Sequence, residues 1–241
     1  MLNFRQTKFL LICICVILAC ILTANVEFEH ICGTNRSGEE VQNFSINQIS
    51  EYERQQGSKL YDRRWFDRII RIDHNTIQPQ LRKRFKQVFK ENNIEVKGKS
   101  VLCVGARRGG EVRAFQDLGA LAIGIDFNPG ERNKHVLYGS ASELQFASNV
   151  FDIIYSNILD HIQDTATFFD EICRVTRRDA FLLLDLDQNK PDEWSVRDLR
   201  GQVDNFSRQV ESKGWIILSR KVISNEKDKG KIALVFKKTF T

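Results

Sequence analysis

The sequence lacks the features that mark several protein classes. Its 241 residues carry a formal net charge of only +5, which is too small to indicate nucleic-acid binding by itself, so no nucleic-acid partner is expected. The six cysteines suggest no disulfide framework, because three lie in an apolar N-terminal run and only Cys32 looks exposed. There are no internal repeats, and no His, Cys, Asp and Glu cluster at the spacing of a metal site.

The N-terminus contains an apolar run over residues 9–22 that extends, with small or polar interruptions, to residue 26. About 20 apolar residues normally span a bilayer, so the run is slightly short. We favour an uncleaved signal-anchor helix that contacts the membrane through residues 9–26. The alternatives are a buried helix and a cleaved signal peptide ending at Ala24, although Leu22 is a poor residue two positions before such a site.

Charge predicts the orientation of this anchor. Arg5 and Lys8 precede the apolar run, whereas acidic residues predominate after it, so the N-terminus should stay in the cytosol. The expected protein is a single-pass type II membrane protein with its catalytic domain in the ER or Golgi lumen; cleavage would make it secreted instead. Sequons at Asn35, Asn43 and Asn205 support the lumenal placement weakly.

Composition divides the chain into four segments. Residues 1–26 form the cytosolic tail and anchor, and residues 27–53 read as a polar stem. Residues 54–98 form a basic helical segment, and residues 99–241 form the main domain.

Within the basic segment, Leu81, Phe85, Val88 and Phe89 follow helical spacing among basic residues such as Arg84. One interpretation is a helix that packs on the domain and leaves its basic face in solvent. The other is a contact with an anionic substrate or a membrane surface.

The main domain alternates apolar strands with amphipathic helices, which predicts an α/β fold with helices on both faces of a mostly parallel sheet. A closing pair of strands joined by a polar turn should make the last of seven strands antiparallel, in a Rossmann-like arrangement. The expected strands are 101–104, 121–125, 136–138, 151–155, 180–186, 215–222 and 232–236, and the expected helices are 109–118, 165–175 and 196–210.

A glycine-rich turn follows the first strand and precedes a helix, in the sequence Gly105-Ala106-Arg107-Arg108-Gly109. Asp126 ends the second strand, 21 residues after Gly105, where an acid can bind ribose hydroxyls. A dinucleotide fingerprint needs a second glycine at position 107, and the Arg107 side chain would crowd a pyrophosphate. The sequence therefore favours S-adenosylmethionine (SAM) over NAD, and a nucleotide-sugar or NAD enzyme is the weaker alternative.

Five successive blocks, "VLCVGARRGGE", "GIDFNPG", "SASELQF", "FDIIYSNILDHI" and "FFDEICRV", resemble the motifs of class I SAM-dependent methyltransferases of the type 11 group. The resemblance covers about residues 99–187. It implies that the first turn holds the methionine portion of the cofactor and that Asp126 binds ribose. It also implies that the block before the fourth strand contacts adenine and that the residues after this strand form the floor of the site. The cofactor-binding residues implied are Gly105, Ala106, Arg107, Gly109, Asp126, Phe127, Ser140, Ala141 and Asn157, with Glu143 as a further candidate.

The chain departs from the family pattern at several positions. Cys103 and Ser140 stand where the family usually has acids, and the first turn reads "GARRGG" instead of G-x-G. These departures motivate an alternative function, a methyltransferase-like binding or scaffold protein without activity.

Methyl transfer to a hydroxyl or amine needs a base, and His161 after Asp160 is the best-placed candidate because histidine titrates near neutrality. In the alternative interpretation, Asp160 caps a turn and His161 only packs beneath the cofactor. Asp185 and Asp187 end the fifth strand and could touch the substrate. The expected acceptor is a small molecule or a glycan of the secretory pathway; the sequence indicates neither its identity nor the oligomeric state.

Overall fold

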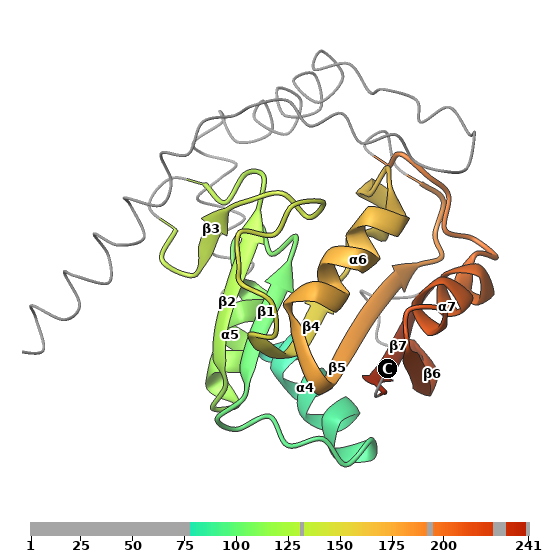
Figure 1. Ribbon diagram of the computed structural model, residues 1–241. Helices are drawn as coiled ribbons and strands as arrows, with labels where there is room; N and C mark the ends of the chain where they lie inside the picture. Colours follow the sequence, from blue (N-terminus) through green and yellow to red (C-terminus); the bar gives the residue numbers. More distant parts are fainter. Residues whose placement is uncertain (1–77, 131–132, 192–194, 224–229, 240–241) are drawn as a thin grey trace, which may run out of the picture. The chain divides into compact units, whose positions relative to one another are not determined.

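A computed structural model of the protein describes residues 78–130, 133–191, 195–223 and 230–239 (Figure 1). The chain separates into a unit of residues 1–43 and a unit of residues 44–241, and every described residue lies in the second. The predicted anchor at 9–26, the stem at 27–53 and most of the basic segment lie outside the described residues. Within the described part, no helix is long and apolar enough to cross a membrane.

Seven strands form one sheet in the order β3-β2-β1-β4-β5-β7-β6, and β7 runs antiparallel to both of its neighbours. This confirms the predicted Rossmann-like α/β fold with an antiparallel last strand. The strands are β1 (Ser100–Val104), β2 (Leu121–Asp126), β3 (Val136–Tyr138), β4 (Phe151–Ser156), β5 (Thr176–Asp187), β6 (Trp215–Ile223) and β7 (Lys231–Lys238).

Helices cover both faces of the sheet (Figure 1). Helices α4 (Gln78–Glu91) and α5 (Gly110–Asp117) pack on one face, and α6 (Thr165–Val175) and α7 (Val203–Glu211) pack on the other. Strand β1 shows why: Leu102 and Val104 enter the core beneath α6, whereas Val101 and Cys103 enter the core beneath α4 and α5. A strand buried on both faces is apolar throughout, as residues 101–104 of β1 are.

Helix α4 confirms the interpretation of the basic segment as a packed helix at this point. Phe85, Val88 and Phe89 are buried, and the Phe85 ring stacks on Phe115 of α5 with ring centroids 4.5 Å apart. Arg84 differs from the expectation of a solvated basic face, because its guanidinium enters the core.

The helix predicted over residues 196–210 was too long at its start, since α7 begins at Val203. Residues 195–202 follow a different path because the N–H groups of Val196 and Arg197 donate to the Asp160 carbonyl, over 2.8 and 3.2 Å. Leu199 is buried without being helical. This loop therefore ties the entry to α7 to the segment that follows β4.

Candidate functional site

The end of β2 and the loops after β1, β2, β3 and β4 carry the predicted cofactor-binding and catalytic residues to one edge of the sheet. Val104 lies opposite both Ile125 of β2 and Ser156 of β4, and Asp126 lies opposite Tyr138 of β3. The strand order reverses between β1 and β4, and ligands of open α/β sheets bind at such a point beyond the carboxyl ends of the strands.

The turn after β1 is held against β2. The N–H groups of Gly105 and Ala106 both donate to the Ile125 carbonyl, over 2.9 and 3.0 Å. A Cβ atom on Gly105 would overlap Cγ2 of Ile158, so the space beside this glycine belongs to the Ile158 side chain and not to a ligand. The sequence did not indicate this role for Ile158.

Arg107 and Asp126 are joined at the centre of the site. The Arg107 N–H donates to Oδ2 of Asp126 over 2.9 Å, and the Asn128 N–H donates to Oδ1 over 2.8 Å. Arg107 has a positive φ of 37°, and its carbonyl accepts a hydrogen bond from the Asn133 side chain. These contacts fix the Asp126 carboxylate and the turn relative to each other.

Gly109 precedes α5 with a φ of 81°, where a Cβ atom would lie 2.9 Å from Cβ of His135. Partial burial, with smaller contributions from Arg113 and Lys134, lowers the pKa of His135. The sequence assigned His135 no role, and the structure places it against the start of α5.

The predicted adenine-contacting residues lie on the next two loops. The Phe127 ring packs edge-on against Tyr138, with centroids 6.5 Å apart. The Ser140 hydroxyl accepts a hydrogen bond from the Ser142 N–H over 3.2 Å, and Ala141 is buried.

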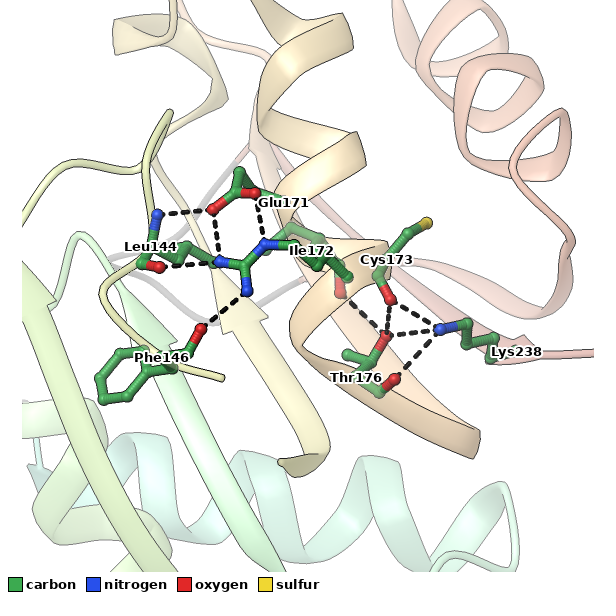
Figure 2. Close-up of polar contacts among 8 residues, drawn as sticks. Leu144, Phe146, Glu171, Ile172, Cys173, Thr176 and Lys238 are labelled. Carbon is green, nitrogen blue, oxygen red and sulfur yellow. Dashed lines mark hydrogen bonds and ion pairs between the residues drawn. The ribbon is translucent and has the colours of Figure 1, made fainter. Parts of the chain in front are cut away.

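A clamp from α6 holds the loop after β3, and Figure 2 shows its contacts. Glu171 accepts a hydrogen bond from the Leu144 N–H over 2.7 Å, and Arg174 donates to the carbonyls of Leu144 and Phe146, each over 2.8 Å. Arg174 also pairs with Glu171 over 2.7 Å, and its hydrogen bond to Glu171 is the main reason why the pKa of that carboxyl is lowered. The sequence offered one signal for this clamp, the i, i+3 spacing of two opposite charges in "FFDEICRV".

The loop after β4 contains Asn157, which is half-buried, and the short helix η2 (Leu159–His161). The His161 Nε2 atom lies 3.5 Å from Oδ2 of Asp160, and the Ser195 hydroxyl donates to the same oxygen over 3.3 Å. The two predicted catalytic residues are thus adjacent and partly accessible, and the loop before α7 contacts Asp160.

Asp185 follows Leu184, which lies opposite Ser156 at the end of β4, so it has the expected position along β5, but its side chain is buried and not open to a substrate. It is 3% exposed, forms an ion pair with Arg84 of α4, and accepts a hydrogen bond from the Tyr155 hydroxyl over 2.7 Å. Burial and the Asp185 charge raise the pKa of Tyr155 well above its usual value. Burial alone would lower the pKa of Arg84, but the Asp185 carboxylate outweighs it and raises that pKa. Asp185 therefore stabilises the packing of α4 on the sheet.

The residues present suit SAM. The Asp126 carboxylate, with two backbone donors and further lone pairs, can also accept hydrogen bonds from two ribose hydroxyls. Phe127 offers an aromatic ring beside it, and nothing at the turn requires a phosphate. Over the described residues, no three His, Cys, Asp or Glu side chains gather as a metal site would need.

Comparisons with known proteins agree with this geometry. Residues 102–184 match the family model of the methyltransferase domain of the type 11 group. No curated protein sequence matches the chain.

Among solved structures, the fold resembles the 1,6-didemethyltoxoflavin-N1-methyltransferase of Burkholderia thailandensis, which was crystallised with 1,6-didemethyltoxoflavin and S-adenosylhomocysteine. The TM-score is 0.61 at 14% identity, over 88% of this chain and 99% of that one. A SAM-dependent methyltransferase from Archaeoglobus fulgidus gives 0.51 at 14%, over 65% and 94% of the two chains. A Haloferax volcanii methyltransferase in complex with the Trm112 activator gives 0.50 at 14%, over 60% and 84%. Residues 102–184 are thus similar to a methyltransferase domain of the type 11 group, and the Rossmann-like fold resembles those of the three solved structures.

Proposed function

We propose that this domain is an active methyltransferase that transfers a methyl group from SAM to a small-molecule or glycan acceptor. The observation that carries the proposal is the Asp126 carboxylate, which two backbone N–H groups hold in place at the point where the strand order reverses. Such preorganisation suits a ligand that offers hydroxyl donors. An inactive scaffold is less favoured, because the altered turn still closes on Asp126.

Each loop has a part in binding the cofactor. Asp126 accepts hydrogen bonds from the ribose, and Phe127, Ser140 and Ala141 bound the adenine. The turn from Gly105 to Gly109 takes the methionine portion. When bound, SAM supplies a methyl group on a positively charged sulfur, which is already reactive toward nucleophiles. The protein therefore contributes chiefly by orienting the acceptor.

His161 is the group that would take the proton released by a hydroxyl or amine acceptor. Its imidazole lies beside the Asp160 carboxylate, which suits a ring that becomes positively charged during the reaction. Asn157, at the start of the same loop, would form the floor of the site near the transferred methyl group.

Calorimetric titration of the full chain with SAM and with S-adenosylhomocysteine tests the cofactor. We expect saturable binding that weakens at least about tenfold in Asp126→Ala, since a hydrogen bond to a charged group contributes about 1.5–3 kcal/mol. Asp170→Ala is the matched control, because Asp170 is an exposed acid on α6 that pairs with Lys213. A folded protein that binds neither ligand would overturn the proposal.

Turnover separates an enzyme from a scaffold. Candidate acceptors would be screened by the formation of S-adenosylhomocysteine, with His161→Gln as the variant expected to bind SAM normally but to transfer the methyl group at least about a hundredfold more slowly. Normal binding of SAM without transfer to any acceptor, and without slow hydrolysis, would favour the scaffold.

We further propose that residues 9–26 anchor the protein in the ER or Golgi membrane with the domain in the lumen, or that their cleavage releases it for secretion. The support is the apolar run and the charges around it. Sensitivity to a glycosidase that is lost in Asn35→Gln/Asn43→Gln/Asn205→Gln would support lumenal placement. An unglycosylated protein that fractionates with the cytosol would contradict it.

A further inference from the structure

Arg107 has a backbone conformation that its side chain disfavours. Four described residues other than glycine have positive φ, and three of them are Asn or Asp, which adopt the left-handed region readily. Arg107, at 37°, is the exception. A glycine would adopt this conformation without strain, so the arginine side chain carries a cost at this position that its interactions must offset.

The backbone contacts of Arg107 do not explain the choice of residue. Its N–H donates to Asp126 and its carbonyl accepts from Asn133, and a glycine would form both hydrogen bonds equally well. The turn therefore needs the conformation of residue 107 but makes no use of its guanidinium.

The guanidinium is available for a ligand. Arg107 is exposed and forms no ion pair with any residue that the structure describes. By contrast, other arginines of the domain, such as Arg174 and Arg177, pair with acids over 2.7 and 3.2 Å. An exposed cation on the turn that receives the methionine portion of SAM is well suited to an anion on that portion.

We propose that the Arg107 side chain binds the α-carboxylate of SAM and so selects cofactors that carry this group. The inference rests on the proposed function, because it assumes that Asp126 binds the ribose. The backbone bond between Arg107 and Asp126 fixes residue 107 beside the ribose-binding carboxylate. From there a long, forked side chain can reach a carboxylate at the end of the methionine arm and bind it through two N–H groups.

Decarboxylated SAM, which differs from SAM by this carboxylate alone, is the discriminating probe. The full chain and its Arg107→Gly and Arg107→Lys variants would be titrated with SAM and with decarboxylated SAM. We expect Arg107→Gly to bind SAM about tenfold or more weakly and to bind decarboxylated SAM unchanged or better. Arg107→Lys should recover part of the loss, because it keeps the charge but not the fork.

Arg208→Gln, on the exposed side of α7, is the matched control for the loss of one positive charge. Arg107→Gly should also keep or raise the midpoint of thermal unfolding, since it removes the strain, and this shows that the weaker binding does not reflect misfolding. Equal losses for both ligands, or no loss for SAM, would overturn the inference. If the wild-type chain bound neither ligand, the proposed function itself would fail.

Discussion

The side chain of Ile158 fills the space beside Gly105. A Cβ atom on Gly105 would overlap Cγ2 of Ile158 and would lie 2.9 Å from its Cδ1 atom. Gly105 belongs to the turn after β1 and Ile158 to the loop after β4, so this contact joins the two loops on either side of the point where the strand order reverses. The glycine is needed for packing between loops as well as for its φ of 79°.

Gly105→Ala should destabilise the protein by about 1–3 kcal/mol more than the backbone strain alone requires, because a methyl group would overlap Ile158. Gly98→Ala isolates the strain, since Gly98 also has a positive φ of 75° but a Cβ atom added there would have no atom within 4 Å. Urea denaturation of both variants measures the difference in the free energy of unfolding.

The double variant Gly105→Ala/Ile158→Ala completes this test. Removing the Ile158 side chain should relieve the overlap, so the two substitutions together should cost less than the sum of their separate costs. Strict additivity, or equal effects of Gly105→Ala and Gly98→Ala, would show that the contact does not constrain residue 105.

The sheet could be predicted from the sequence because each strand has a local signal. β1 and the apolar part of β5 are short apolar runs, and Gly119 and Gly214 mark the ends of the helices before β2 and β6. The glycine-rich sequence indicated the turn after β1, and the spacing of 21 residues from Gly105 to Asp126 indicated the acid at the end of β2. Since parallel strands end at one edge, these two local signals were enough to bring the site residues together.

The features of the fold and the site that were not predicted depend on contacts between distant segments, for which the sequence has no local signal. The pairing of Arg84 with Asp185 joins residues 101 positions apart, and it turns an expected substrate contact into a core contact. Likewise, the Asp160 carbonyl accepts hydrogen bonds from the N–H groups of Val196 and Arg197, which prevents the first turns of a helix that apolar spacing favoured. Periodicity indicates which residues are buried, but not which partner buries them.

The ion pair between Arg84 and Asp185 gives a second prediction. Arg84→Met should lower the free energy of unfolding by about 3–5 kcal/mol, because it leaves the Asp185 carboxylate buried without its cation. Arg82→Met is the control on the same helix. The Arg82 side chain is 53% exposed and lies 3.7 Å from Asp117, so its loss should change the free energy of unfolding by less than about 1 kcal/mol.

Replacing both partners tests the cause of this loss. Arg84→Met/Asp185→Asn should recover much of the stability, since it leaves no buried charge at this site and keeps an acceptor for the Tyr155 hydroxyl. Chemical denaturation of the three variants supplies the comparison; a double variant as unstable as Arg84→Met would mean that packing of the arginine stem, and not its charge, is what matters.

The clamp from α6 gives a third prediction, about the loop after β3. Arg174→Gln removes the hydrogen bonds to the carbonyls of Leu144 and Phe146, so the loop should open more often. Amide hydrogen exchange at Leu144 should accelerate about tenfold, because its N–H bond to Glu171 loses its support. Arg220→Gln is the control, as Arg220 of β6 pairs with Asp204 of α7 at an exposed site outside this loop. Unchanged exchange at Leu144 in Arg174→Gln would show that Glu171 holds the loop alone.

The start of α6 gives a fourth prediction, which concerns pH. Asp164 caps this helix by accepting hydrogen bonds from the N–H groups of Ala166 and Thr167, and the Thr167 hydroxyl also donates to it. The hydrogen bond from that hydroxyl is the main cause of the lowered pKa of Asp164. A carboxyl with a lowered folded-state pKa stabilises the protein above its unfolded pKa of about 3.9, and this contribution is lost as the pH falls through the folded-state value.

Asp164→Ala should therefore cost about 1 kcal/mol at pH 7, and the difference from wild type should shrink as the pH falls below about 4. Asp164→Ser separates the cap from the charge, because serine caps helices without titrating in this range. It should keep most of the stability at pH 7 and lose less of it in acid than the wild type does. Urea midpoints measured from pH 7 to pH 3 check both expectations. If the wild type and Asp164→Ser lost stability in parallel, the acid sensitivity would have to come from other carboxyls with lowered pKa, such as Asp152 and Glu171, and the charge on Asp164 would contribute nothing to it.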